Sequence, residues 1–166
     1  MKNYTGTLSL FLFISVLVGQ PTFTEHAIDT STHGARDVYA ADVDGDGDMD
    51  VLSASGYDYK IAWYENDGSE GFTEHAIDTS ADGAWSVHAV DVDGDGDMDV
   101  LSASMNDDKI AWYENDGSES FTEHAISDSA NGANSVYAAD VDGDGDMDVL
   151  SASVYDDKIA WYENDG

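Results

Sequence analysis

Asp42-Val-Asp-Gly-Asp-Gly-Asp-Met-Asp50 is the stretch that decides the fold of this chain. The same nine residues return unchanged at 91–99 and at 140–148, each time 49 residues further on. Five carboxylates in nine residues repel one another, by about 4 kcal/mol per pair at about 4 Å in an effective dielectric near 20. A cation among them removes that repulsion. The stretch therefore predicts a metal site that occurs three times in a fold built from a repeated unit.

The ligand chemistry of the stretch points to calcium. Oxygen is the only ligand type in it, and the chain contains no Cys. A flexible loop rich in carboxylates and glycines favours a hard ion of high coordination number, Ca²⁺ rather than Mg²⁺. The stretch is not an EF-hand loop, because its twelfth position is Ser53 instead of a bidentate Glu and no helical pattern follows. We expect about one Ca²⁺ per repeat.

Position in the loop assigns the ligands. Side chains of the first, second, third and fifth aspartates are expected to bind the ion, and the fourth aspartate contributes its main-chain carbonyl. Gly47 then takes a backbone conformation that a Cβ would forbid. The expected ligand residues are Asp42, Asp44, Asp46, Asp48 and Asp50, then Asp91, Asp93, Asp95, Asp97 and Asp99, then Asp140, Asp142, Asp144, Asp146 and Asp148.

The net charge limits the partners of the chain. With 36 Asp and Glu against 5 Lys and Arg, the formal charge is −31. Such a charge excludes nucleic acid and anionic membrane surfaces as electrostatic partners. Hydrophobic residues still make up 42% of the chain, so there is material for a packed core.

The N-terminal residues predict secretion. Lys2 precedes an apolar run from Leu8 to Val18, which is too short to span a bilayer, and the small residue Gly19 follows. We interpret residues 1–19 as a signal peptide, with an N-terminal strand or a retained anchor as the alternatives. After cleavage we expect no membrane insertion. Extracellular calcium is millimolar, which suits sites with dissociation constants of about 10⁻⁴ to 10⁻³ M.

Residues 20–166 are almost entirely repeat, in units that span 23–71, 72–120 and 121–166. A period of 49 residues lies in the range of propeller blades. Each unit offers four β-type runs separated by turn residues. In the first unit the runs are Phe23 to Ile28, Asp37 to Val43, Met49 to Ala54 and Lys60 to Glu65. We predict an all-β fold, a β-propeller-type array of three four-stranded antiparallel blades that forms a partial propeller.

The repeat resembles a known family. The calcium stretch with its preceding Val-Tyr-Ala-Ala and following Val-Leu, and then Lys-Ile-Ala-Trp-Tyr-Glu-Asn-Asp-Gly, is similar to the FG-GAP/VCBS-type repeat of secreted β-propellers, which include the integrin α-chain head. The resemblance covers Phe23 to Gly166. It implies that the loop joins the innermost strand of a blade to the second strand, and that Phe72 to Ile77 is the outermost strand of the blade begun before it. Ser53-Ala54-Ser55 stands where the family has Gly-Ala-Pro, so integrin-like ligand binding does not carry over.

Three blades are too few to close a ring, because propellers have about four to eight. The chain is then an open arc, a fragment of a longer array, or one half of a homodimer. In the homodimer, Phe23 to Ile28 of each copy would complete the last blade of the other and give a six-bladed ring.

Differences among the three repeats gather on the face opposite the calcium loops. They occur at Arg36, Trp85 and Asn134 and on the connections 56–59, 105–107 and 154–156. Exposed aromatic residues there suit a carbohydrate or a protein ligand. Neutral drift after duplication gives the same pattern.

The other repeated residues are expected to be structural. His26, His75 and His124 recur beside a Glu, and we expect hydrogen bonds between blades rather than catalysis. Trp63, Trp112 and Trp161 are expected in the core between blades. The sequence thus favours a secreted, non-catalytic module for binding or adhesion. The alternatives are a propeller domain of a secreted polysaccharide lyase or hydrolase, and a structural fragment of a larger cell-surface protein.

Overall fold

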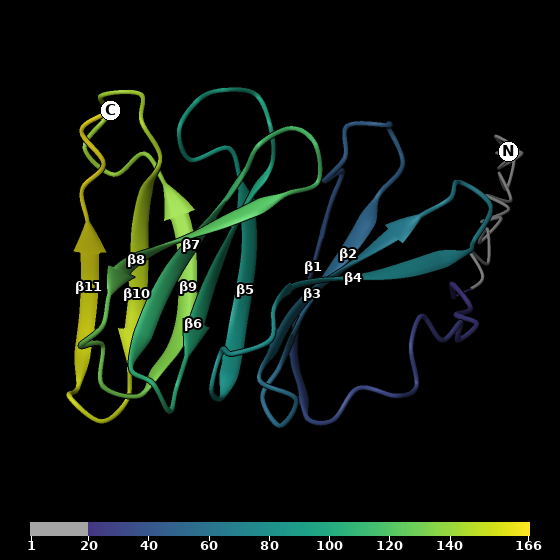
Figure 1. Cartoon of the computed structure of the whole chain (residues 1–166), viewed down its shortest axis with the longest axis horizontal. Helices are drawn as coiled ribbons and strands as arrows, with labels where there is room; N and C mark the ends of the chain where they lie inside the picture. The colour runs from purple at the N-terminus through teal and green to yellow at the C-terminus, as the bar shows by residue number, and fades with distance from the viewer. Residues whose placement is uncertain (1–19) are drawn as a thin grey trace, which may run out of the picture.

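The chain folds into three antiparallel β-sheets (Figure 1). The computed structural model describes residues 20–166, so the predicted signal peptide over residues 1–19 lies outside the described residues. The first sheet consists of β1 (Ala35–Ala41), β2 (Asp50–Ser55), β3 (Lys60–Asn66) and β4 (Phe72–Asp78), in that order. The second consists of β5 (Ala84–Val90), β6 (Asp99–Ser104), β7 (Lys109–Asn115) and β8 (Phe121–Ser127), and the third of β9 (Ala133–Ala139), β10 (Asp148–Ser153) and β11 (Lys158–Tyr162). No helix among these residues is long and apolar enough to cross a membrane.

The three sheets lie side by side in chain order and do not close into a ring (Figure 1). The first strand of each sheet is the innermost, because β5 packs against both β1 and β9. This arrangement confirms the predicted blade order, in which the metal loop joins the innermost strand to the second. It also confirms that the segment from Phe72 is the outermost strand of the sheet begun before it.

Stacking of the sheets decides which residues are buried. The sequence Asp-Val-Leu-Ser-Ala-Ser forms β2, β6 and β10, yet only in β6 are all six residues buried. The second sheet has a neighbour on each face, whereas the outer two have only one. Two apolar cores result, one on each face of the second sheet. Large side chains in the first core include Leu52, Ile61, Trp63 and Tyr113, and in the second Leu101, Ile110 and Val149.

Polar groups tie neighbouring sheets at equivalent places in the repeat. Ser86 Oγ donates a hydrogen bond to Asp37 Oδ2 at 2.9 Å, and Val136 N donates to Ser86 Oγ at 3.4 Å. Between the first two sheets, the Tyr113 hydroxyl donates to Asp78 Oδ2 at 2.9 Å. Each junction therefore combines an apolar core with a few fixed hydrogen bonds.

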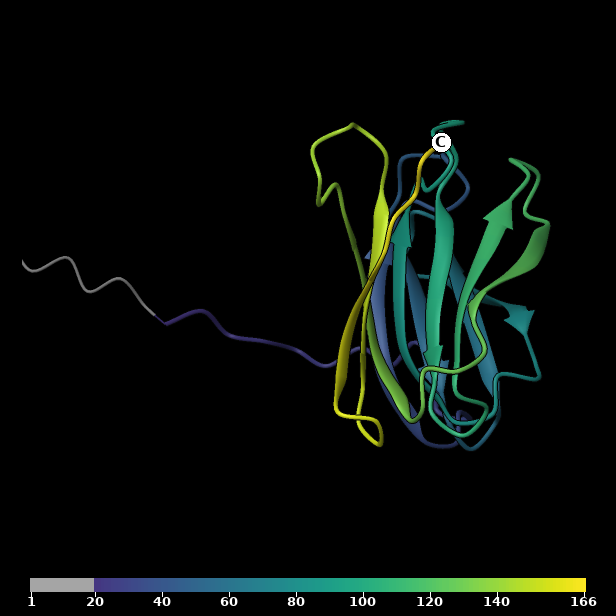
Figure 2. The ribbon, with the colours of Figure 1, turned by 90° about the vertical axis from the view of Figure 1, so that its left-hand side faces the viewer.

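The prediction of a strand at Phe23 to Ile28 is wrong, and the third sheet has three strands instead of four. The segment is irregular and exposed, with 93% of the Phe23 surface accessible, and leads away from the sheets (Figure 2). The equivalent segments at Phe72 and Phe121 pair with the third strand before them. Within residues 20–166 no such strand precedes Phe23, so the segment lacks the neighbour that β4 and β8 use.

The two ends of the array expose residues that the junctions bury. Val38 in β1 is 67% exposed, whereas the equivalent Val87 is 3% exposed. At the other end Trp161 is 45% exposed and Trp63 is fully buried. Trp63 thus lies in the core between sheets, as predicted, and Trp161 does not, because no sheet in residues 20–166 covers that face of the third sheet.

His88 lies in a column of rings on the innermost strands. Its imidazole packs between Tyr39, at 4.5 Å between ring centroids, and Tyr137, at 4.6 Å. Only 7% of His88 is exposed, and burial lowers the pKa of its imidazole, although the charge of Asp37 acts in the opposite direction. The folded chain therefore holds His88 neutral below the pH at which the unfolded chain protonates it.

We expect His88→Tyr to make the folded chain less sensitive to acid. A lowered pKa means that stability is lost as pH falls below the unfolded value of about 6.5, and Tyr, which the other repeats carry here, does not titrate in that range. From pH 7.5 to pH 5.5, in saturating calcium, the melting temperature should decrease by less in the variant than in the parent chain. A packing change caused by the larger ring affects the variant equally at both pH values, so it cancels when the two decreases in melting temperature are compared. Equal falls would show that His88 does not contribute.

Candidate metal centres

Each predicted metal loop connects the first two strands of its sheet, and all three loops lie at the same edge (Figure 1). The loop turns sharply because Gly45 and Gly47 have φ of 75° and 99°, which residues with a Cβ rarely adopt. Main-chain groups fix the aspartates within the loop. Gly47 N donates to Asp42 Oδ2 at 3.1 Å, and Asp46 N donates to Asp44 Oδ1 at 3.1 Å.

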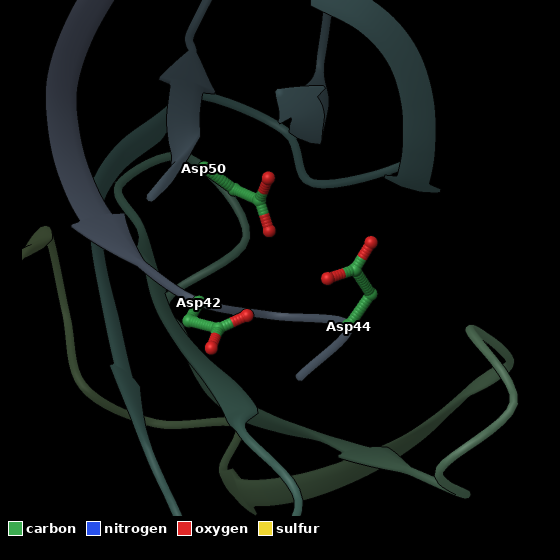
Figure 3. Close-up of side chains that lie close together, drawn as sticks. All are labelled: Asp42, Asp44 and Asp50. Carbon is green, nitrogen blue, oxygen red and sulfur yellow. The ribbon is translucent and has the colours of Figure 1, made fainter. Parts of the chain in front are cut away.

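Three carboxylates converge in every loop. Oxygens of Asp42, Asp44 and Asp50 lie within 4.8 Å of one another (Figure 3). Ca²⁺–O distances are about 2.3–2.6 Å, so two oxygens bound to one ion lie at most about 5 Å apart. The same arrangement occurs in the other loops with Asp91, Asp93 and Asp99, and with Asp140, Asp142 and Asp148. The chain thus has three aspartate clusters positioned to hold a metal ion, with spacing and ligand type compatible with Ca²⁺.

The last aspartate of each cluster is fully buried and held by main-chain donors. Asp99 Oδ2 accepts a hydrogen bond from Val92 N at 2.9 Å, and Oδ1 accepts one from Asn115 N at 2.8 Å. Asp50 and Asp148 accept equivalent bonds in their own loops. This carboxylate therefore joins the start of the loop to the end of the third strand of the sheet.

Burial and crowding act against ionisation of the clusters. Partial desolvation within the loop, with a contribution from neighbouring carboxylates, raises the pKa of Asp44, Asp93 and Asp142, although Asp93 and Asp142 are exposed. Burial in the second sheet also raises the pKa of Asp99. In the third sheet, hydrogen bonds from Asn164 and Val141 instead lower the pKa of Asp148. A cation in the cluster would favour the charged form of all three carboxylates.

One oxygen in the first cluster needs a partner. Asp42 Oδ1 is buried and accepts no hydrogen bond within the described residues. A buried carboxylate oxygen without a donor is costly, by about 1–3 kcal/mol or more for a charged group. An ion among Asp42, Asp44 and Asp50 would satisfy it, so the residues present fit a bound Ca²⁺.

The third and fourth aspartates of each loop lie outside the three-carboxylate clusters. Asp46 Oδ1 accepts a hydrogen bond from Asp48 N at 2.8 Å, and the Asp48 side chain lies against Gly68 in the β3–β4 turn. That orientation is compatible with the role predicted for the Asp48 carbonyl. The ligand roles of Asp46, Asp48 and their equivalents Asp95, Asp97, Asp144 and Asp146 stay predictions.

A repeated asparagine links the metal loops to one another, and sequence reasoning missed it. Asn115 is 2% exposed, and its Nδ2 donates to Met98 O at 3.1 Å in its own repeat and to Val43 O at 3.3 Å in the preceding loop. Asn164 makes the equivalent bonds to Met147 O and Val92 O. The repetition is visible in the sequence, because Glu-Asn-Asp-Gly occurs in every repeat, but the motif does not show which carbonyl groups the asparagine reaches. The first and second metal loops are thus each connected to the sheet that follows.

The histidine prediction needs correction. His75 does not bond between blades; its Nε2 lies 2.8 Å from Glu65 Oε2 on the neighbouring strand of the same sheet. The imidazole stacks on Trp63 with 4.5 Å between centroids, and His124 repeats both contacts with Glu114 and Trp112. Pairing of the third and fourth strands places each histidine beside the Trp and Glu of its own sheet. The predicted order of strands did not specify this register.

The residues that differ among repeats are brought together at the opposite edge. Arg36, Trp85 and Asn134 each occupy the bulge position of an innermost strand. The Arg36 guanidinium lies over the rings of Trp85 and Tyr57. The prediction that these positions share the face opposite the metal loops agrees with this geometry.

Comparison with known proteins identifies the repeat. The sequence profile of the FG-GAP-like repeat matches residues 42–102 and 91–151, so the two matches cover more than half of the chain. No curated protein matches the chain in sequence. The matched residues contain all three aspartate clusters. The chain therefore belongs to the FG-GAP-like repeat family.

Proposed function

We propose that this chain is a secreted, calcium-stabilised repeat module that binds a carbohydrate or protein ligand without catalysing a reaction. The observation that carries the proposal is that one edge of the sheets is constant among the repeats and the opposite edge is variable. Three identical aspartate clusters occupy one edge, while the residues that differ among repeats occupy the other. A constant edge suits a structural ion, and a variable edge on a rigid scaffold suits recognition. FG-GAP repeats are typical of extracellular proteins, which supports secretion.

The histidine geometry favours a binding role over catalysis. The His75–Glu65 and His124–Glu114 pairs occupy equivalent places in two sheets, and each imidazole stacks on a Trp. A His–Glu pair that recurs with the repeat, with its hydrogen bond already made, has a structural role within the sheet. A polysaccharide-acting enzyme would need one convergent acid and base that break the repeat symmetry.

A glycan array and a panel of extracellular matrix proteins, each probed in millimolar Ca²⁺ and again in excess chelator, test this function. We expect saturable binding that requires Ca²⁺ and no cleavage of any bound polysaccharide. Binding that is unchanged in chelator would contradict the role of calcium. Release of shorter products would assign the chain to the enzyme class instead.

We further propose that two copies of the chain assemble through the ends of the array. The first sheet has an asparagine, Asn66, whose Nδ2 donates only to Met49 O, whereas Asn115 also reaches the preceding loop. The last sheet offers Val141, which corresponds to the acceptor Val43. Both ends also expose apolar residues, including Val38 and Trp161. A second copy that continued the stack would make the contacts already present at the internal junctions.

The irregular N-terminal segment has a place in such an assembly. Phe23 to Ile28 has the sequence that forms β4 and β8, Phe-Thr-Glu-His-Ala-Ile, and β11 has no strand on its outer edge within the described residues. Paired there, His26 would meet Trp161 as His75 meets Trp63. The segment of each copy would complete the third sheet of the other.

Light scattering in millimolar Ca²⁺ and physiological salt should give twice the monomer mass. The net charge of −31 on each copy opposes association, so the dimer fraction should fall as salt is lowered. Deleting residues 20–28 should weaken the dimer if strand exchange contributes. A well-folded monomer under these conditions would contradict the assembly.

A further inference from the structure

A hollow of about 180 Å³ lies between the first and second sheets, at the edge away from the metal clusters. It is formed by the bulge positions of β1 and β5 and by the turns that follow β2 and β6. Its lining residues are Arg36, Gly56, Tyr57, Tyr59, Gly83, Trp85, Met105 and Asn106. No Asp or Glu is among them, although the chain contains 36 acidic residues.

Arg36 is the cation of this hollow. Its guanidinium carbon lies 4.4 Å from the centre of the Trp85 ring and 5.3 Å from the centre of the Tyr57 ring. Each lysine of residues 20–166 pairs with a carboxylate: Lys60 with Glu74, Lys109 with Glu123 and Lys158 with Asp156. Across this part of the chain Arg36 alone carries a positive charge without an acidic partner.

The backbone holds Arg36 in place. The bulge between Ala35 and Asp37 turns its side chain out of the ladder, which is a common role of bulges beside binding sites. The side chain then lies over Gly56, where an added Cβ would come within 3.4 Å of Arg36 Nε and 3.1 Å of Ala84 O. The other repeats carry Met105 and Val154 at the position of Gly56. Glycine there leaves room for the arginine.

Tyr57 is held as firmly from the other side. Its main-chain N donates to His33 O at 3.2 Å, and Gly56 N donates to Gly34 O at 2.9 Å. The Tyr57 ring lies across Gly34, whose φ is 73° and where a Cβ would come within 2.7 Å of the ring. Tyr57 is nevertheless 71% exposed, so the ring is fixed in direction and open to solvent.

The chemistry of the hollow selects a carboxylate. A guanidinium stacked between rings uses its faces for them and keeps its N–H edge for a planar anion, which it binds with two parallel hydrogen bonds. The volume is below the roughly 300–1,000 Å³ of sites that enclose a drug-sized ligand, so it fits one ring of a larger molecule. The Tyr57 and Tyr59 hydroxyls suit a ring that carries hydroxyl groups better than a purely apolar ring, whereas the Asn106 Nδ2 already donates to Asp82 Oδ1 at 2.9 Å.

We propose that this hollow binds one carboxylate-bearing sugar ring, a uronic acid residue at the end of a glycan. The assignment rests on the proposed function and names its ligand class. The carboxylate pairs with the N–H edge of Arg36, and the ring lies against the exposed tyrosines. Net charge of −31 repels extended polyanions, which restricts the ligand to a single charge presented at a chain end.

The next junction along the array provides a built-in comparison. The residues equivalent to Arg36, Tyr57, Tyr59 and Trp85 are there Trp85, Asn106, Asp108 and Asn134. That junction has no guanidinium, and it has a carboxylate where the hollow has a tyrosine. The proposed site therefore occurs at one junction of the two.

The test is a titration of the ¹⁵N-labelled chain in millimolar Ca²⁺ with methyl glucuronide, and in parallel with methyl glucoside, which lacks the carboxylate. We expect the glucuronide to shift the Trp85 indole N–H cross-peak with at least tenfold tighter binding than the glucoside.

Arg36→Gln should abolish this preference for the glucuronide. Arg36→Lys should retain part of it, because lysine keeps the charge without the two-pronged geometry. Gly56→Met, which restores the residue of the second repeat, should displace Arg36 and weaken binding. Asn134→Ala at the other junction is the matched control and should leave binding unchanged.

Several results would overturn the assignment. These are equal affinity for the two sugars, glucuronide binding that survives in Arg36→Gln, and no binding of either sugar. Tighter binding of N-acetyltyrosine, which mimics a peptide C-terminus, would assign the hollow to peptides. Every variant is also melted with and without Ca²⁺. A retained calcium shift with failed sugar binding overturns this site alone, whereas loss of the shift in the parent chain overturns the proposed function.

Discussion

Chelation of calcium should bring the chain close to its unfolding midpoint. In 10 mM Ca²⁺, sites with dissociation constants of about 10⁻⁴ to 10⁻³ M see about 10 to 100 times that concentration, which stabilises the folded state by about 1.4–2.7 kcal/mol per site and about 4–8 kcal/mol for three sites. Domains are stable by only about 5–15 kcal/mol in total. Fifteen loop carboxylates would also repel one another without the ions. Circular dichroism melts in 10 mM Ca²⁺ and in excess chelator should differ by tens of degrees.

Magnesium is the control for this effect. Mg²⁺ requires near-octahedral geometry and gives up its waters reluctantly, so the aspartate clusters should recover only a small part of the lost stability with it. Equal rescue by both ions would point to general charge screening. An unchanged melt in chelator would contradict a structural role for the metal.

Asp99→Asn should cost more stability than the loss of its metal ion. Both Asp99 oxygens accept main-chain hydrogen bonds in a fully buried position, and an amide can accept only one of them while its NH₂ faces the other donor. A buried donor left without an acceptor costs about 1–3 kcal/mol, and bonds to a charged group contribute about 1.5–3 kcal/mol. Urea unfolding in 10 mM Ca²⁺ should show a loss of roughly 3–5 kcal/mol beyond that of the control described next.

Asp93→Asn is the matched control. Asp93 belongs to the same cluster but is exposed, and its one main-chain bond, from Asp95 N, is within the loop. Its replacement removes a ligand charge while leaving the buried bonds intact. Equal destabilisation by the two variants would mean that Asp99 acts only through the metal.

The local features of the fold could be predicted from the sequence because each depends on residues close together in the chain. The period, the strands from Asp37, Met49 and Lys60, and the convergence of Asp42, Asp44 and Asp50 all follow from patterns within one repeat. The wrong prediction, a strand from Phe23 to Ile28, depends on a pairing strand that lies elsewhere in the fold. Phe23 to Ile28 has the sequence of a strand and forms none, because a strand requires an edge and the repeat pattern does not state whether one exists.

Contacts between different repeats also could not be predicted from the sequence. The bond from Asn115 to Val43 spans 72 residues, and nothing in Glu-Asn-Asp-Gly distinguishes it from a turn residue. The position of Arg36 over Gly56 likewise depends on two segments that meet only when β1 and β2 pair. The residues were visible as departures from the repeat, but only their placement showed that they form one hollow.

The asparagine that connects the first and second metal loops to the sheets that follow them has a consequence for chain length. Both junctions use an Asn side chain as donor and a Val carbonyl as acceptor, so a duplicated segment 72–120 would carry both partners of this link. A gene carrying extra copies of it would encode a longer arc without any new interface having to arise. Curvature per unit would then set how many copies bring the two ends together, and the junction that holds Arg36 would be carried along unchanged. The length of such an array can therefore change by duplication of one segment while the link between loop and next sheet stays the same.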